Sequence, residues 1–227
     1  MQKIAMEKFK ELPVTYSLML ISIVVFIIPL IVPKLEGSIY VAGALHDYEI
    51  FIKGQVYRFI SSMFMHSGAM HIVMNMLSLY MIGQVLEKLF RPLTYLSIYF
   101  VTGIFGSLLF LYINTDGQAV GASGAIFGIF GALAGFAWVH RKTMHDEFMR
   151  FIQSFGMILL INFALGLAIP EIAMSAHIGG LITGIISGMI MAKYPNYLWA
   201  YLLVSFTLIF LSYNYIASLY ATSFLLH

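Results

Sequence analysis

The strongest constraint on this chain is a series of long apolar runs, most of them separated by short connections. Seven runs have a length close to the roughly 20 residues that a helix needs to cross a bilayer. The mean hydropathy of +0.91 and the 10% content of charged residues place the chain outside the range of soluble proteins. We therefore expect an all-α membrane protein, a polytopic helical bundle. The runs are Tyr16–Val32, Ala69–Leu86, Leu93–Ile113, Ser123–Val139, Phe151–Ala168, Ser175–Ala192 and Tyr197–Tyr220.

The first run has an alternative interpretation as a secretory signal, because lysines precede it and Ala42-Gly43-Ala44 has the small-x-small form of a cleavage site. Two observations oppose that interpretation. The run is long enough to span a bilayer, and the small residues begin ten positions after its end. We expect the run to be retained as a transmembrane helix. The chain has no cysteine, which excludes disulfides, thiolate metal sites and cysteine catalysis.

The distribution of basic residues predicts how the chain is oriented in the membrane. The net charge of +2 is too small to indicate nucleic acid as a partner. If the N-terminus is cytoplasmic, the inner segments hold nine basic residues and the outer segments three, as the positive-inside rule requires. The nine are Lys3, Lys8, Lys10, Lys88, Arg91, Arg141, Lys142, Arg150 and Lys193, and the three are Lys34, Lys53 and Arg58.

Four polar residues lie at one level of the predicted bundle. In this orientation the second, fourth and sixth runs all lead from the outer side inward. His71 and Asn75 lie in the first turns of the second run, Ser123 opens the fourth, and His177 is the third residue of the sixth. All four lie within about 10 Å of the outer boundary, at roughly 1.5 Å per residue. Polar groups stranded in hydrocarbon cost several kcal/mol, so their common depth indicates a function.

Glycines recur every three or four residues in the fourth and sixth runs, and His177 shares the face of those in the sixth. Small residues at this spacing allow membrane helices to pack with their backbones in contact. We expect the two runs to pack through these stripes, and packing alone is an alternative explanation of them. The glycines are Gly124, Gly128, Gly131 and Gly135 in the fourth run and Gly180, Gly184 and Gly188 in the sixth.

Serine and histidine at one level predict nucleophilic catalysis, with His177 as the general base that activates Ser123. No acid lies in any run near that level, and Asp116 and Glu171 are in connecting loops. We therefore expect a Ser–His dyad rather than a triad. The oxyanion formed by attack on an amide needs preplaced donors, which the Ser123 backbone N–H and the side chains of His71 and Asn75 offer.

Simpler interpretations compete for each residue. A serine at a helix start is often a cap or a packing residue, and His71 with Asn75 also fits an interhelical hydrogen-bond clamp. A metal site is disfavoured, because His66 and His71 are five positions apart, no HExxH occurs and no carboxylate lies beside them. We expect no metal and no cofactor.

At this point the residues resemble a known family. The motif Gly121-Ala122-Ser123-Gly124, a later Ala176-His177 with Gly180 and Gly184, and an earlier His66 with His71-Ile72-Val73-Met74-Asn75 look like the rhomboid intramembrane serine proteases. The resemblance covers roughly Gln55 to Met191. It implies that Ser123 is the nucleophile, that His177 is the base, and that His71 and Asn75 help to bind the oxyanion.

The resemblance also implies a domain organisation. Residues 1–15 are expected to be a cytoplasmic segment, 16–192 a six-helix catalytic core, and 197–220 an additional seventh span, which is similar to the 6+1 arrangement of part of the family. The loop of about 36 residues between the first two runs is expected to be partly embedded against the bundle edge. The charges of Asp47, Glu49, Lys53 and Arg58 indicate that this loop reaches the water interface.

Two positions depart from the family pattern. Many members carry Trp-Arg in the first outer loop, where this chain has Tyr57-Arg58. Many members carry a tyrosine that packs on the catalytic histidine ring, and here the residue is Phe127. Phenylalanine keeps the ring face, so we expect the packing to be retained.

The resemblance implies that the partners are single-span membrane proteins, which enter from the bilayer near the fifth run and must unwind, since a helix hides its carbonyls. Residues Ile169–Met174 are the expected cap of the site. The expected location is a bacterial plasma membrane, and the sequence does not predict the oligomeric state. The alternatives are a catalytically silent relative that binds membrane clients, and a small transporter, for which paired repeats are missing.

Overall fold

The computed structural model describes residues 12–114, 117–143 and 173–225, with isolated positions at 146, 149, 150, 153 and 157. Six helices in this part of the chain are long and apolar enough to cross a membrane. Their ends agree with six of the predicted runs to within a few residues, while the predicted fifth span falls almost entirely outside the described residues. The helices are α2 (Pro13–Ile31), α6 (Ala69–Leu89), α7 (Pro92–Ile113), α8 (Ser123–His140), α10 (Met174–Lys193) and α11 (Leu198–Leu225).

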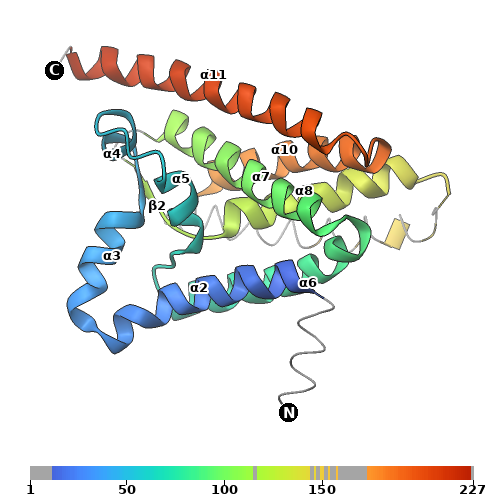
Figure 1. The fold of residues 1–227 in the computed structure, drawn as a ribbon, viewed down its shortest axis with the longest axis horizontal. Helices are drawn as coiled ribbons and strands as arrows, with labels where there is room; N and C mark the ends of the chain where they lie inside the picture. Colours follow the sequence, from blue (N-terminus) through green and yellow to red (C-terminus); the bar gives the residue numbers. More distant parts are fainter. Residues whose placement is uncertain are drawn as a thin grey trace.

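The N-terminus of α2 is capped by a buried carboxylate on α6. Glu87 accepts hydrogen bonds from the N–H groups of Val14 at 2.6 Å and Thr15 at 3.0 Å, and from the Thr15 hydroxyl at 2.6 Å. The first N–H groups of a helix have no partner within it, and in hydrocarbon such groups are costly if left unpaired. Glu87 therefore caps α2 and ties it to α6, and the two helices lie side by side in Figure 1.

Helices α7, α8 and α10 form the centre of the bundle, with α11 crossing outside α7 (Figure 1). The glycine stripes make the contact between α8 and α10. A Cβ atom on Gly180, Gly184 or Gly188 would overlap a carbonyl oxygen of α8, and one on Gly131 or Gly135 would overlap a carbonyl oxygen of α10. The predicted close packing of these two helices is confirmed.

The segment between α2 and α6 is a chain of short elements packed on the side of the bundle. Its α4 and α5 contribute Ile50 and Phe59 to an apolar cluster with Leu108 of α7 and Ile216 of α11, so the segment is anchored against the bundle edge as expected. Strand β1 (Leu45–His46) pairs antiparallel with strand β2 (Gln118–Ala119), which lies just before α8. The elements are η1 (Pro33–Leu35), α3 (Glu36–Gly43), β1 (Leu45–His46), α4 (Asp47–Phe51), α5 (Arg58–Ser61) and η2 (Ser62–Phe64).

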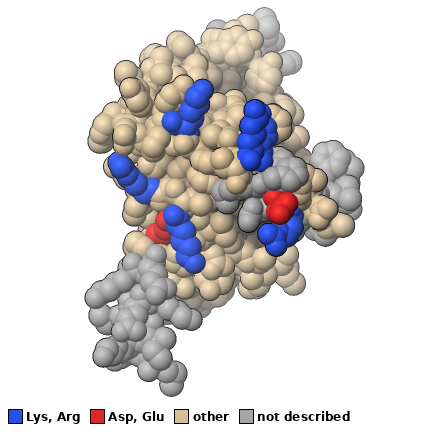
Figure 2. All heavy atoms as spheres, turned by 90° about the vertical axis from the view of Figure 1, so that its right-hand side faces the viewer, with Lys and Arg blue, Asp and Glu red and all other residues tan. Residues whose placement is uncertain are grey.

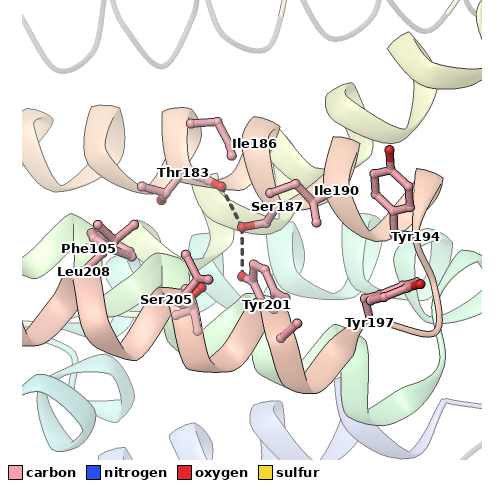
Figure 3. Close-up of a pocket in the computed structure, with 13 residues that line it drawn as sticks. Phe105, Thr183, Ile186, Ser187, Ile190, Tyr194, Tyr197, Tyr201, Ser205 and Leu208 are labelled. Carbon is pink, nitrogen blue, oxygen red and sulfur yellow. Dashed lines mark hydrogen bonds between the residues drawn. The ribbon is translucent and has the colours of Figure 1, made fainter.

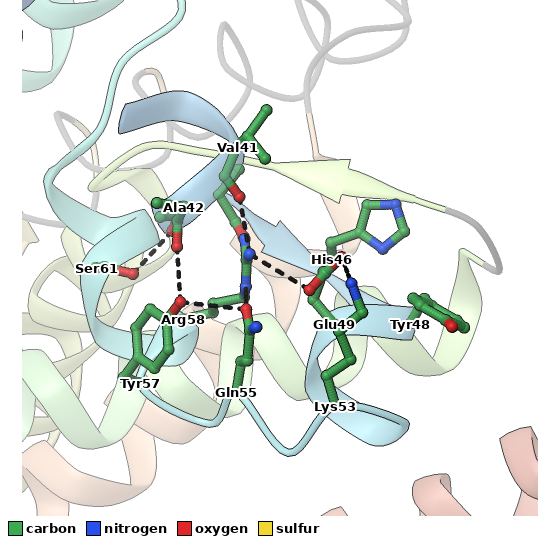
Figure 4. Close-up of polar contacts among 12 residues, drawn as sticks. Val41, Ala42, His46, Tyr48, Glu49, Lys53, Gln55, Tyr57, Arg58 and Ser61 are labelled. Carbon is green, nitrogen blue, oxygen red and sulfur yellow. Dashed lines mark hydrogen bonds and ion pairs between the residues drawn. The ribbon is translucent and has the colours of Figure 1, made fainter. Parts of the chain in front are cut away.

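The four charges that indicated contact of this segment with the water interface differ in their exposure. Lys53 is 49% exposed, whereas Arg58 and Asp47 are only 3% and 1% exposed. The Arg58 guanidinium is satisfied internally, because it donates to the carbonyls of Val41 at 2.8 Å and Ala44 at 2.6 Å, and to the Gln55 side chain (Figure 4). Hydrogen bonding of this kind offsets the cost of burying the charge.

The two ends of the bundle differ in character. At one end, called the serine end, α6, α8 and α10 begin at Ala69, Ser123 and Met174. At the other, called the basic end, α8 and α10 finish at His140 and Lys193. Figure 2 looks at the basic end and shows lysine and arginine side chains spread across it, with little acidic surface among them.

Candidate active site

Ser123 is placed at the serine end by a sharp turn that only glycine adopts easily. Gly121 has φ of 128°, and its N–H donates to the Ser62 carbonyl at 2.9 Å. A Cβ atom at Gly121 would lie 2.8 Å from His71 Nε2 and 3.8 Å from Ser123 Oγ. The His71 ring and the Ser123 hydroxyl therefore both lie close to the backbone of Gly121.

His177 lies in the first turn of α10 and is buried. Its ring stacks on Phe127, with centroids 4.3 Å apart and planes 9° apart. Phe127 is one turn beyond Ser123 on α8, so the imidazole lies over the face of α8 that begins with the serine. The retained ring packing expected at Phe127 is confirmed.

The approach of α8 and α10 brings the immediate neighbours of the two candidate residues into contact. A Cβ atom on Gly124 would lie 3.5 Å from the Ala176 carbonyl oxygen. In the part of the chain that the structure describes, no hydrogen bond joins Ser123 to His177, and His177 Nδ1 is buried without a partner. Helices α8 and α10 are thus in contact beside the two candidate residues, while the described structure has no hydrogen bond between the Ser123 and His177 side chains.

His71 is held by the turn that precedes α6. Its Nδ1 receives the Ser67 backbone N–H at 3.4 Å and lies 3.0 Å from the Ser67 hydroxyl. A backbone N–H only donates, so Nδ1 is the acceptor and the proton of a neutral ring is assigned to Nε2. That nitrogen is the one beside Gly121, so His71 presents an N–H donor toward the serine.

His66 packs edge-on against His71, with ring centroids 5.1 Å apart. It lies before α6 begins, and burial, together with the nearby His71, lowers the pKa of His66 to about 4. His66 is therefore neutral near pH 7 and adds no charge beside the His71 ring. Its role in this geometry is to support that ring.

Asn75 is buried one turn after His71, and its side-chain N–H₂ donates to the His71 carbonyl at 2.9 Å. In the described part of the chain, the hydrogen bonds of the His71 and Asn75 side chains stay within residues 67–75. Among the described residues these bonds form no interhelical clamp, which was the alternative interpretation. The amide group keeps a second N–H that this bond does not use.

A small cavity of about 30 Å³ lies beside Ser123. Its lining includes Ser62, Ser107, Gly121 and Ala176. A space of this size is large enough for a water molecule, which needs roughly 10–15 Å³ of probe-occupied volume. The site therefore combines a serine, a histidine from a second helix and room for water.

Among the described residues, nothing supports a third catalytic residue or a metal site. His177 Nδ1 has no carboxylate partner there, and the described residues hold no cluster of three or more metal-binding side chains. Asp116, Glu171 and most of the expected cap at residues 169–174 lie outside the described part of the chain.

Sequence reasoning missed Ser67 and the bond that orients His71. The only signal available was a hydroxyl residue four positions before a histidine at a helix start, a spacing that brings side chains together when the turn is helical. It also missed the Ser62 carbonyl, which fixes Gly121 from a distant segment and leaves no trace in the local pattern.

The fold and site define a polytopic membrane protein with a serine and a histidine on facing helices at one end of the bundle. A family model, the Rhomboid domain, matches residues 53–194, and the chain belongs to the rhomboid family. The matched region contains all four candidate residues.

Curated relatives agree with this assignment. The chain is 35% identical over 158 residues to RHOMBOID-like protein 6, mitochondrial, of Arabidopsis thaliana, covering 69% of this chain and 50% of the relative. It is 33% identical over 148 residues to rhomboid protease GluP of Bacillus subtilis, covering 63% and 28%. It is 32% identical over 159 residues to rhomboid-like protease 5 of Toxoplasma gondii, covering 69% and 18%. The chain thus spans about half the length of these relatives or less.

Proposed function

We propose that this protein is an intramembrane serine endopeptidase that hydrolyses peptide bonds in or near transmembrane segments through a Ser123–His177 dyad. The observation that carries the proposal is the position of His177. The His177 ring stacks on Phe127, one turn from Ser123. Ser123 also lies close to the Gly121 backbone that the His71 ring approaches, and it lines a cavity large enough for a water molecule. Relatives named as rhomboid proteases support the same reaction class.

In the proposed reaction Ser123 Oγ attacks the substrate carbonyl carbon while His177 takes its proton. His177 then gives that proton to the leaving amine, and an acyl-enzyme remains. A water, for which the cavity beside Ser123 provides space, gives a proton to His177 and attacks the ester carbonyl. The bond from the carbonyl carbon to Ser123 Oγ then breaks, Oγ takes the proton back from His177, and the acid product is released. The hydrogen bond between Ser123 and His177 forms in the substrate-bound state of this proposed reaction.

The oxyanion is assigned to three donors. These are the Ser123 backbone N–H at the positive end of α8, the Nε2–H of His71, and the free N–H of Asn75. The tautomer set by Ser67 supports the role of His71, because the proton then lies on the nitrogen beside Gly121. His66 remains neutral near pH 7, so it does not compete for the anion as a charged group.

We further infer the domain organisation and the orientation. Residues 16–192 form the catalytic core and residues 197–220 add a seventh span, with residues 1–15 in the cytoplasm. The basic end faces the cytoplasm under the positive-inside rule, so the serine end lies near the outer face. Single-span membrane proteins are the substrate class, and their released portions leave on the outer side.

The proposal is tested by cleavage of a model single-span substrate in vesicles. Ser123→Ala should remove cleavage, and thermal unfolding should be nearly unchanged because the hydroxyl has little packing role. Ser107→Ala is a matched control, since Ser107 lines the same cavity from α7 and has no assigned chemistry. Cleavage that persists in Ser123→Ala would assign the nucleophile elsewhere. Wild-type protein that binds the substrate without cleaving it would favour the silent, client-binding alternative.

The orientation has its own test in this cysteine-free chain. A cysteine at Lys53 should react with an impermeant thiol reagent outside intact cells. A cysteine at Lys142 should react only after the membrane is opened. Labelling of position 142 from outside would reverse the orientation and withdraw the proposed side of product release.

A further inference from the structure

A groove of about 520 Å³ lies between α10 and α11, at the opposite end of the bundle from Ser123. Its sides are formed by residues at helical spacing on one face of each helix (Figure 3), and Val101 and Phe105 of α7 also line it. The residues of the two sides run from Thr183 on α10 to Tyr194 just after its end, and from Tyr197 just before α11 to Leu208 on that helix. The two helices therefore present matching faces that do not close on each other.

The floor of the groove is polar but already satisfied. Ser187 donates to the Thr183 carbonyl at 2.7 Å and pairs with the Tyr201 hydroxyl at 2.9 Å, and Ser187 and Tyr201 are both buried. Figure 3 shows this bond bridging the two helices beneath the groove. Because these groups bind each other, the groove offers mainly hydrocarbon to an occupant. Aliphatic side chains, including Ile186, Ile190 and Leu208, form its exposed walls.

The length of the groove matches one leaflet. From Tyr194 to Thr183 the helix rises by roughly 16 Å at 1.5 Å per residue. The hydrocarbon core is about 30 Å thick, so a single leaflet accounts for about 15 Å of it. Beyond this point α11 is occupied, because Ile209, Tyr213 and Ile216 pack on α7 and on the segment between α2 and α6. A partner helix that crosses both leaflets would find no groove in the second.

The mouth of the groove is aromatic and basic. Tyr194 and Tyr197 line it, and tyrosine is enriched at membrane–water interfaces. Lys193 Nζ lies 5.3 Å from the Tyr194 ring centroid, and Arg91 Nη2 donates to the Asn196 side chain at 3.4 Å, next to Tyr197. Lys193 ends α10 and Arg91 directly precedes α7, so both cations lie at the basic end. Figure 2 shows lysine and arginine side chains spread across that end. A ligand with a negative headgroup and an apolar tail complements this arrangement.

We propose that the α10–α11 groove binds an anionic phospholipid of the leaflet at the basic end, with one acyl chain along Ile186, Ile190 and Leu208 and the phosphate headgroup at Lys193 and Arg91. Helices in a bilayer gain no hydrophobic free energy by closing such a gap, so an acyl chain fills it at little cost. Basic pockets between membrane helices at this depth bind anionic headgroups. The binding is independent of peptide cleavage.

The test uses the purified full chain in mixed micelles of detergent with phosphatidylglycerol or with phosphatidylcholine of the same acyl chains. Phosphatidylglycerol should raise the Tm saturably, by roughly 5–10 °C at a concentration about 100 times Kd, and phosphatidylcholine should raise it less. Val204→Trp, which fills the groove, should remove both increments. Leu203→Trp, one residue away and outside the groove lining, should keep them.

A second pair of variants tests the headgroup site. Arg91→Gln with Lys193→Gln should abolish the difference between the two lipids, whereas Arg141→Gln with Lys142→Gln at the same end should retain it. A photoactivatable phosphatidylglycerol should attach to α10 or α11. Equal responses to the two lipids, an unchanged response in Val204→Trp, or attachment elsewhere would overturn the proposal. Reduced substrate cleavage in Val204→Trp with an intact lipid response would give the groove to the substrate helix, and would also overturn it.

Discussion

Helix α10 uses two of its faces in opposite ways. On one face Gly180, Gly184 and Gly188 bring its backbone against that of α8, so closely that no Cβ atom fits. On the other face Ser187 makes a hydrogen bond to Tyr201 of α11, and the larger side chains around it leave a groove. In a bilayer the hydrophobic effect does not drive helices together, so contact depends on small residues and polar bonds.

The two faces of α10 differ in how closely the distance to the neighbouring helix must be fixed. The candidate dyad is divided between α8 and α10, and a misplacement of about 1 Å between reacting groups can cost roughly 10²-fold in rate. The glycine contact fixes that spacing. The α10–α11 face carries no assigned catalytic residue, so it tolerates a gap that a lipid chain can occupy.

The largest combined effect on stability and cleavage is expected from bulk on the glycine face. Gly184→Val should lower both stability and cleavage, by about 1–3 kcal/mol or more for overpacking and about 10²-fold in rate, because its Cβ overlaps the Gly128 carbonyl. Thr183→Val is the neighbouring control on the groove face and should retain most of both. Melting temperature and substrate cleavage measure the pair, and equal behaviour of the two variants would remove the distinction between the faces.

Asn75→Ala should reduce cleavage by about 10²–10³-fold, the usual loss for one oxyanion donor, with residual activity from the other donors. Asn214→Ala is the matched control, since Asn214 makes the same kind of bond to the carbonyl four residues earlier, at 2.7 Å. Single-turnover rates with a model substrate provide the measurement. Full activity of Asn75→Ala would leave this asparagine with a structural role only.

Ser67 is expected to act through His71 as a positioning residue. Loss of its hydroxyl removes one neutral hydrogen bond worth about 0.5–1.5 kcal/mol, which corresponds to roughly a 2–10-fold lower kcat. KM should be unchanged, and Ser67→Thr should restore the rate because it keeps the hydroxyl. A purely structural role would instead lower the melting temperature of Ser67→Ala without a selective change in kcat.

The smallest effect is expected at the bond between α10 and α11. Tyr201→Phe removes the Ser187 hydrogen bond, and such bonds in membrane helices are worth about 0.6 kcal/mol on average. Thermal unfolding should shift slightly and cleavage should stay at the wild-type rate. A loss of cleavage as large as that expected for Gly184→Val would show that the groove face also sets the active-site spacing.

The sequence predicts the parts of this fold that depend on local composition. Hydropathy predicts six of the seven expected spans to within a few residues, and the remaining one, the fifth, lies almost entirely outside the described residues. The glycine spacing predicts the α8–α10 contact, because the pattern can be read on each helix separately. Ser123 and His177 stand out for a similar reason, since polar groups are costly in apolar runs. Placing them together required only the topology.

Other features depend on partners that are distant in the chain. The burial of Arg58 has no signal in the local sequence, because the sequence does not show the Val41 and Ala44 carbonyls that accept its hydrogen bonds. The β1–β2 ladder has two residues per strand, too few for a periodic pattern. The groove follows from where α11 packs, and neither helix face alone distinguishes a closed contact from an open one.

The most direct test of the central claim is to map where a serine-reactive fluorophosphonate attaches to the purified protein. The account predicts a single adduct on the peptide that contains Ser123, formed as the hydroxyl oxygen displaces fluoride from phosphorus. The adduct should be absent in Ser123→Ala and much slower to form in His177→Ala. An adduct on another residue, or labelling of His177→Ala at the wild-type rate, would contradict the dyad.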